Sequence, residues 1–271
     1  MTEAYIDLQL HTNCSDGVWS PERLYAEIRA KDLECFSVTD HDTIDAYPVP
    51  ADLASRCVPG LEVDTEHEGH TVHLLAYGVT DPDCVLLTAL RKQRDERVVR
   101  MKAIVERMRG LGVDVTFEDV RAQVAGGGSV GRPHLARALL AKGIVSNIQE
   151  AFDKYLADGE KGFVKLKRLT SADIVPMVHD SGGIVVIAHP KRLREERHLP
   201  EIADLGVEGV EAVHPSADAD YQRHIIDFAD ARGLLVTGGT DFHAPETHPL
   251  PGIMFSRDRL ERFLARVAAL A

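Results

Sequence analysis

Short apolar runs alternate with helical segments along most of the chain, and this alternation constrains the fold more than any other feature. Helical periodicity begins after Ser20 and Pro21, and it returns at 218–232 and 257–270. Strands that alternate with helices are typical of βαβ units, so we predict an α/β fold with a mainly parallel sheet. Seven such runs favour closure of this sheet into a barrel. The predicted strands are 4–10, 35–39, 57–62, 71–77, 184–188, 207–213 and 234–239.

A stretch of about 75 residues interrupts the alternation, because it contains only helical patterns. We predict a small all-helical insertion domain at 86–160 within an α/β body formed by 1–85 and 161–271. The glycine-rich segment Ala125–Ser129 is predicted to be a flexible joint between two helices. It lacks the Lys-Ser/Thr pair that follows a phosphate-binding P-loop. The predicted helices of the insertion are 86–109, one that begins at Thr116, 132–142 and 146–157.

The charge of the chain argues against two classes of partner. Its 31 basic and 43 acidic residues give a net charge of −12, which disfavours long nucleic acid and anionic membranes. A small phosphorylated ligand stays compatible if metal ions or a local basic patch supply positive charge. No apolar run approaches the roughly 20 residues that span a bilayer, and the N-terminus does not resemble a signal peptide. We therefore expect a cytoplasmic protein whose four separated cysteines are reduced.

Histidines and carboxylates gather where the predicted strands end. Each one alone has a simpler explanation, such as a helix cap, a turn or a surface charge. Their joint occurrence favours a single cluster, because the ends of strands converge at one edge of an α/β sheet or barrel. Imidazole and carboxylate are ligands of Zn, Mn and Fe. The residues are His11, Asp16, Asp40, His41, Glu62, His73, His189, His214, Asp241 and His243.

The order of these motifs resembles that of the PHP (polymerase and histidinol phosphatase) family within the amidohydrolase superfamily. The matching motifs are "SDG", "TDHD", "PGLE", "AHP" and "DFH", and they occur on both sides of the insertion. The resemblance implies a distorted seven-stranded (β/α) barrel with up to three divalent metal ions. The segment "GRPHLARALLAKG" in the insertion resembles the branch of phosphatases acting on nucleoside 3′,5′-bisphosphates and of 5′→3′ exoribonucleases.

The resemblance also implies the metal ligands and a weakness among them. Gln9 stands where the family has a second histidine, and an amide is a poorer ligand than imidazole. We therefore expect two firmly bound ions and leave a third open, with Mn2+ as the expected metal and Zn2+ or Fe2+ as alternatives. Asp7 is expected to orient a ligand, with direct coordination in place of Gln9 as the alternative. The three expected ligand sets are His11, Glu62 and Asp241; Glu62, His73 and His189; and Asp16, His41 and His243.

Catalysis and substrate binding need further residues. His214 and Asp40 are candidates for the general acid, with structural capping as the alternative role of each. The expected phosphate contacts are Arg132 and His134 at a helix start, Lys165 in the basic run 161–168, and Lys191. A solvated strand face is the alternative for the basic run.

Three functions follow from these residues and the resemblance. The first is a phosphatase that removes the 3′-phosphate of nucleoside 3′,5′-bisphosphates. The second is a 5′→3′ exoribonuclease on short 5′-phosphorylated RNA, and the third is a non-catalytic metal-binding module. The negative charge favours the small substrate.

Overall fold

A computed structural model describes residues 2–124, 130–157, 159–164, 168–246 and 250–270. The chain divides into two compact units. One consists of Met1–Leu90 and Arg168–Ala271, and the other of Arg91–Lys167. Each unit has its own apolar core, so each is described by itself. The segment Ala125–Ser129, predicted to be a joint, lies outside the described residues.

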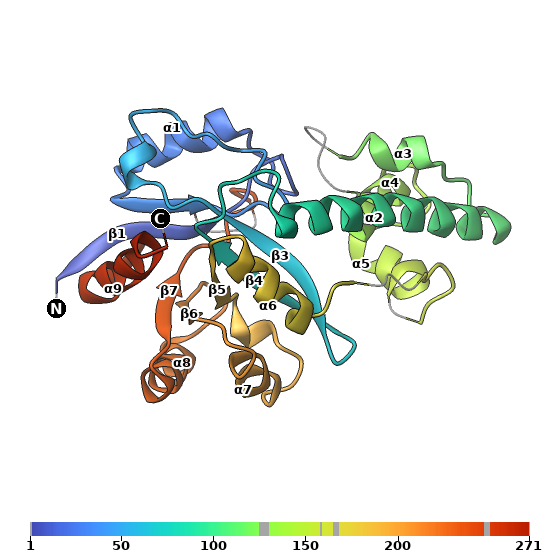
Figure 1. Cartoon of the computed structure of the whole chain (residues 1–271). Coiled ribbons are helices and arrows are strands. Elements are labelled where there is room, and N and C mark those ends of the chain that lie inside the picture. The colour runs from blue at the N-terminus through green and yellow to red at the C-terminus, as the bar shows by residue number, and fades with distance from the viewer. Residues whose placement is uncertain (1, 125–129, 158, 165–167, 247–249, 271) are drawn as a thin grey trace. The chain divides into compact units, whose positions relative to one another are not determined.

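The first unit contains two mixed sheets (Figure 1). One has the strand order β2-β1-β8, and the other has the order β3-β4-β5-β6-β7. Isolated bridges pair three strand residues with residues just outside the strands: Leu10 of β1 with Phe242, Phe36 of β2 with Cys57, and Glu62 of β3 with His41. The strands are β1 (Glu3–Leu10), β2 (Cys35–Val38), β3 (Gly60–His67), β4 (His70–Tyr77), β5 (Ile184–Ile187), β6 (Gly209–Val213), β7 (Leu235–Gly238) and β8 (Ile253–Ser256).

The prediction of a mainly parallel sheet is wrong. Among the strands described, β1–β2, β5–β6 and β6–β7 are parallel, whereas β3–β4, β4–β5 and β1–β8 are antiparallel. The reason is a tight hairpin between β3 and β4. Glu68 and Gly69 have φ values of 48° and 82°, and two successive positive φ values form the type I′ turn that reverses a strand in two residues.

Helices cover the sheets of the first unit. Ser20 caps α1 by accepting a hydrogen bond from the Arg23 amide at 3.3 Å, and Pro21 occupies the first helical position. Helix α9 contacts β1 and β7 (Figure 1). The helices are α1 (Pro21–Lys31), α6 (Ser171–Asp180), α7 (His198–Ala203), α8 (Ala219–Arg232), α9 (Arg257–Ala268) and the 3₁₀ turns η1 (Ala54–Arg56) and η3 (Pro190–Arg192).

The core of the first unit lies between these helices and the sheets. Tyr77 and Phe263 are fully buried and meet edge to face, with ring centroids 5.0 Å apart. Burial of an aromatic side chain of this size stabilises a fold by roughly 2–3 kcal/mol. The Tyr77 hydroxyl donates a hydrogen bond to the Leu8 carbonyl at 2.9 Å, which ties the two sheets together. All four cysteines are free.

The described residues of the second unit form helices and no strand. Met101, Ile104, Met108, Leu135 and Leu139 are buried in its core. None of the helices described for the chain is long and apolar enough to cross a membrane. The elements of the second unit are the latter part of α2 (Val85–Gly110), α3 (Phe117–Arg121), α4 (Arg132–Ala141), α5 (Ile148–Ala151) and the π-helical turn η2 (Phe152–Leu156).

Candidate metal centre

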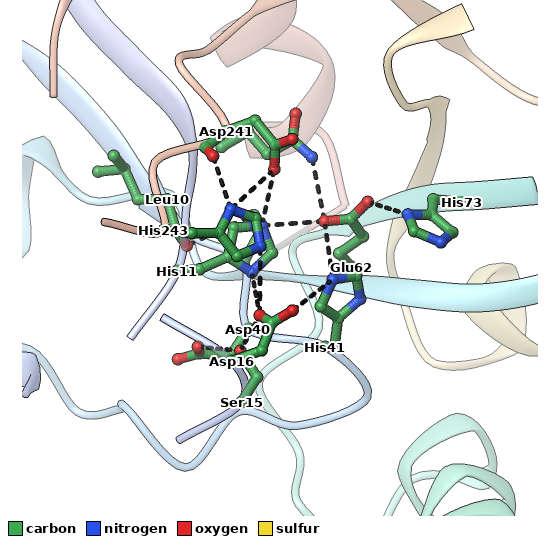
Figure 2. Close-up of polar contacts among 12 residues, drawn as sticks. Leu10, His11, Ser15, Asp16, Asp40, His41, Glu62, His73, Asp241 and His243 are labelled. Atoms are coloured by element: carbon green, nitrogen blue, oxygen red, sulfur yellow. Dashed lines mark hydrogen bonds and ion pairs between the residues drawn. The ribbon is translucent and has the colours of Figure 1, made fainter. Parts of the chain in front are cut away.

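The structure brings together all eight predicted metal ligands in the first unit. They come from strands β3 and β4 and from the segments that follow β1, β2, β5 and β7. Figure 2 shows seven of them, with Glu62 lying between His11, His41 and His73. Two of the eight, His189 and Asp241, have positive φ values of 28° and 53°. Non-glycine residues with such backbone angles are concentrated at functional sites.

Glu62 is shared by several imidazoles. Its side chain is buried, and its Oε1 lies 2.8 Å from His73 Nδ1 and 2.9 Å from His189 Nε2. Its Oε2 lies 2.9 Å from His11 Nε2. Burial alone would raise the pKa of Glu62, but the charges of His41 and His73 hold it well below its ordinary value. The carboxylate is therefore ionised. It faces two groups of ligands at once, one that contains His11 and a second that consists of His73 and His189.

His11 and Asp241 complete the first of these groups. His11 Nε2 lies 3.3 Å from Asp241 Oδ1 as well as close to Glu62. Both ring nitrogens of His11, and Asp241 Oδ1, are buried without a hydrogen-bond partner. Buried polar atoms normally have such a partner. Converging imidazole and carboxylate atoms that lack one fit a divalent metal ion, which would satisfy them together.

A third group lies nearer to solvent. His243 Nε2 is 3.2 Å from Asp16 Oδ1, and His41 Nε2 is 3.8 Å from Asp16 Oδ2. The Asp16 side chain is 42% exposed, whereas Glu62 and Asp241 are each only 1% exposed. A metal ion held by this group would therefore be the most accessible to substrate.

Gln9 lies in the centre, as its position in the sequence predicts. Its side chain is buried, its Nε2 donates a hydrogen bond to Glu62 Oε2 at 3.0 Å, and its Oε1 has no hydrogen-bond partner. An unpartnered amide oxygen is a weak ligand for a hard cation.

Two buried carboxylates hold the ligand-bearing segments in place. Asp40 accepts hydrogen bonds from the Thr12 amide at 2.7 Å, the Thr12 hydroxyl at 2.6 Å and the Ser15 hydroxyl at 2.5 Å. Asp7 accepts from the Thr240 amide at 2.9 Å and the Thr240 hydroxyl at 2.7 Å. Burial raises the pKa of Asp7 to about 6 despite these bonds. Asp40 thus anchors the segment after His11, and Asp7 anchors the segment before Asp241.

His214 lies beside Asp241 and directs its Nε2 toward that carboxylate, while its Nδ1 faces Ser216. Its Nδ1 accepts a hydrogen bond from the Ser216 amide at 3.0 Å. In the neutral form of the ring this leaves the single N–H on Nε2. His214 Nε2 is 3.5 Å from Asp241 Oδ2, and this N–H is available as a hydrogen-bond donor to a bound anion.

The three predicted phosphate contacts that the structure describes are divided between the two units. Lys191 pairs with Asp218 at 2.8 Å and lies over the Tyr221 ring. In the second unit Arg132 Nη1 donates to the Leu156 carbonyl at 2.9 Å, and the buried His134 accepts a hydrogen bond from the Gly131 amide through Nδ1. Lys165 lies outside the described residues. All four stay predictions as phosphate contacts.

Two residues of the centre were not predicted. Asp64 Oδ1 lies 3.0 Å from His41 Nδ1 and 3.3 Å from His73 Nε2. Arg192 Nη1 donates a hydrogen bond to Asp241 Oδ2 at 2.8 Å, with its side chain 47% exposed. Alternation along β3 places Asp64 on the same face as Glu62, a signal that a longer predicted strand would have revealed. No local pattern indicates Arg192.

A mixed α/β fold with this centre defines a class, the metal-dependent hydrolases. The chain is 31% identical over 251 residues to the 3′,5′-nucleoside bisphosphate phosphatase of Chromobacterium violaceum, covering 89% of this chain and 88% of that protein. It is 29% identical over 250 residues to the 5′-3′ exoribonuclease Rnm of Escherichia coli, covering 88% and 85%. No family model matches the sequence.

Two solved structures are similar over nearly the whole chain. A protein of Bifidobacterium adolescentis assigned as a metal-dependent phosphoesterase gives a TM-score of 0.81 at 28% identity, covering 96% of each chain. An amidohydrolase of Chromobacterium violaceum with bound sulfate and no metal gives 0.80 at 29% identity, covering 93% of this chain and 91% of the other. The chain belongs to the PHP family. It is a metal-dependent phosphoester hydrolase.

Metal binding to this centre is expected to release protons. Burial lowers the pKa of His11, but the carboxylates of Asp241 and Glu62, 3.3 Å and 2.9 Å from its Nε2, outweigh burial and raise the value to about 10 in the metal-free protein. Below pH 10 the proton on His11 therefore competes with the metal. For each proton displaced, we expect the Mn2+ affinity to fall by about tenfold with every unit by which the pH is lowered below 10. Titration calorimetry in two buffers of different ionisation enthalpy measures this release, and equal heats in both buffers would contradict the prediction.

Proposed function

We propose that this chain hydrolyses the 3′-phosphate of nucleoside 3′,5′-bisphosphates, giving the nucleoside 5′-monophosphate and inorganic phosphate. The observation that carries the proposal is the buried Glu62 carboxylate, which faces His11 with one oxygen and both His73 and His189 with the other. Such a shared carboxylate is suited to holding two divalent ions beside one phosphate. The 31% identical phosphatase supports the choice of substrate.

The residues fit two metal sites and a third that is more exposed. His11, Glu62 and Asp241 would hold one ion, and Glu62, His73 and His189 would hold another. Asp16, His41 and His243 would hold the third. When bound, divalent ions supply Lewis acidity toward the phosphate oxygens. We propose Mn2+ as the metal. Because Gln9 replaces a histidine there, the site formed by His11, Glu62 and Asp241 is expected to bind its ion more weakly than the site formed by Glu62, His73 and His189.

The remaining side chains bind and orient the substrate. Arg192 is half exposed and reaches Asp241, so its guanidinium can contact a phosphate at the edge of the centre through two N–H groups. His214 directs its Nε2 N–H toward the same place, and we assign it as a hydrogen-bond donor to the oxygen that leaves with the ribose, while solvent water supplies the proton. Asp40 is less suited to this role because both of its oxygens already accept hydrogen bonds from Thr12 and Ser15.

A second candidate function is 5′→3′ exoribonuclease activity on short 5′-phosphorylated RNA. The similarity to the exoribonuclease Rnm favours it, at 29% identity over 250 residues. It needs the same metal centre, because both reactions are displacements at phosphorus. The net charge of −12 favours the smaller anion, since each added phosphate increases electrostatic repulsion.

The test is direct. The Mn2+-loaded protein is given a nucleoside 3′,5′-bisphosphate and, separately, a 5′-phosphorylated trinucleotide. We expect fast phosphate release from the bisphosphate and slow cleavage of the trinucleotide. The reverse order would make the chain an exoribonuclease, and inactivity on both with metal bound would make it a non-catalytic metal-binding module.

Two features of the architecture are also part of this proposal. We propose that the two sheets are parts of one distorted seven-stranded barrel, with the short antiparallel strand β8 outside it. The bridges between Leu10 and Phe242 and between His41 and Glu62 support closure. We further propose that the helical segment predicted at 86–160 is an insertion domain. The separate apolar core around Met108 and Leu135 supports this.

A further inference from the structure

A second group of histidines and carboxylates lies away from the proposed centre. It is formed by the tip of the β3–β4 hairpin and by the segment that leads into α7. His70, Glu195 and His198 each offer one ligand atom, and these atoms all lie within 4.8 Å of one another. His67 adds a third imidazole, with its ring centroid 5.3 Å from that of His198. No step of the proposed function uses these residues.

The strand geometry separates this group from the first. Side chains along β4 point alternately to opposite faces of the sheet. His73 faces the proposed centre, so His70, three residues away, lies on the opposite face with Val72 and Leu74. Its register partner across the hairpin is His67. At about 3.4 Å per residue, His70 lies about 10 Å along the strand from His73.

His198 is the observation that points to a ligand. Its side chain is 0% exposed, and both ring nitrogens lack a hydrogen-bond partner. The nearest carboxylate oxygen recorded for it, on Glu68, is 4.0 Å away, too far for a hydrogen bond. A fully buried imidazole without a partner is unusual. Its ring lies beside His70, with centroids 5.4 Å apart.

Arg197 arranges the carboxylates around these imidazoles. It donates to Glu68 Oε2 at 2.6 Å, Glu195 Oε2 at 2.8 Å and Glu201 Oε1 at 3.0 Å. The second oxygen of Glu195 then faces His70 Nε2 at 3.7 Å, and the second oxygen of Glu201 faces His67 Nε2 at 3.1 Å. Three carboxylates and one guanidinium leave two net negative charges, which match a divalent cation.

We propose that His70, His198 and Glu195 bind a divalent transition-metal ion, with Zn2+ as the best fit. Two imidazoles and one carboxylate are a common zinc ligand set, and His67 or water can complete a tetrahedron. The ion ties the hairpin to the segment between η3 and α7. That segment directly follows η3, which contains Arg192 and begins next to His189, so the ion stabilises the backbone next to the proposed catalytic centre without taking part in the reaction.

Zinc content measures this site independently of activity. The full chain is stripped with a chelator, equilibrated at a buffered nanomolar concentration of free Zn2+, and its zinc per chain is counted by mass spectrometry. We expect His70→Ala and Glu195→Gln each to hold one ion fewer than the unmodified chain. The matched control is His179→Ala, which removes another histidine–carboxylate pair, to Glu208 at 3.2 Å, where the carboxylate is also paired with Arg266 at 3.0 Å.

Two results would overturn the proposal. One is an unchanged zinc count in both variants, and the other is an equal loss in His179→Ala, which would indicate non-specific binding at surface pairs. Glu195 is 45% exposed and glutamine has the same shape, so Glu195→Gln decides the question even where His70→Ala fails to fold. Circular dichroism confirms that the compared variants are folded.

Discussion

Glu62→Gln is expected to lower phosphate release by roughly three powers of ten and to remove most of the bound Mn2+. Glutamine has the shape of glutamate but no charge, and it would place an amide among four imidazoles, at His11, His41, His73 and His189. A loss of about 4 kcal/mol of transition-state stabilisation corresponds to this factor, and Lewis acidity contributes several kcal/mol in metal-dependent hydrolases. The measurements are initial rates on the bisphosphate and metal content per chain.

Glu66→Gln is the matched control for this variant. Glu66 lies four residues further along β3 and pairs with Thr71 in the sheet, beyond the residues that form the centre. It is expected to keep both its metal content and its rate. If Glu62→Gln retained its rate, the shared carboxylate would have no part in catalysis and the proposed function would lose its main support.

The convergence of the eight expected ligand side chains could be predicted from the sequence because its signal is local. Each predicted ligand stands in an apolar run or in the loop that follows one, and strand ends meet at one edge of a sheet. Asp64 was missed because the predicted strand ended at residue 62, whereas the tight turn at Glu68 and Gly69 extends β3 to His67. The same turn makes β3 and β4 antiparallel, which a pattern of alternating elements does not reveal.

Contacts between distant segments account for the other differences. Arg192 reaches Asp241 from a 3₁₀ turn, and no periodicity marks such a contact. Lys191, its neighbour, pairs with Asp218 instead, although the two cations look equivalent in the sequence. The role of Asp40 depends on three donors from Thr12 and Ser15, which lie 25 or more residues away. Strand β8 is short and pairs only with β1 among the described strands, so its pattern is weak.

Asp241→Asn separates a catalytic centre from a structural one. The backbone here is clamped, because the Asp241 amide donates to the Gln9 carbonyl at 3.0 Å and the Phe242 carbonyl accepts from the His11 amide at 3.0 Å. The φ of Asp241 is 53°, a left-handed value that asparagine tolerates better than most residues. The fold is therefore expected to survive this substitution.

Phosphate hydrolysis, in contrast, is expected to be largely lost in the Asp241→Asn variant. Asp241 presents its charge to His11 at 3.3 Å, to His214 at 3.5 Å and to Arg192 at 2.8 Å, and an amide cannot replace that charge for a divalent ion. We expect phosphate release to fall by roughly 10³-fold while the circular dichroism spectrum stays unchanged. Asp204→Asn, at an exposed carboxylate paired with Arg232, should keep full activity. An active Asp241→Asn enzyme would exclude a catalytic role for this carboxylate, and unfolding of the variant would show that its role is structural.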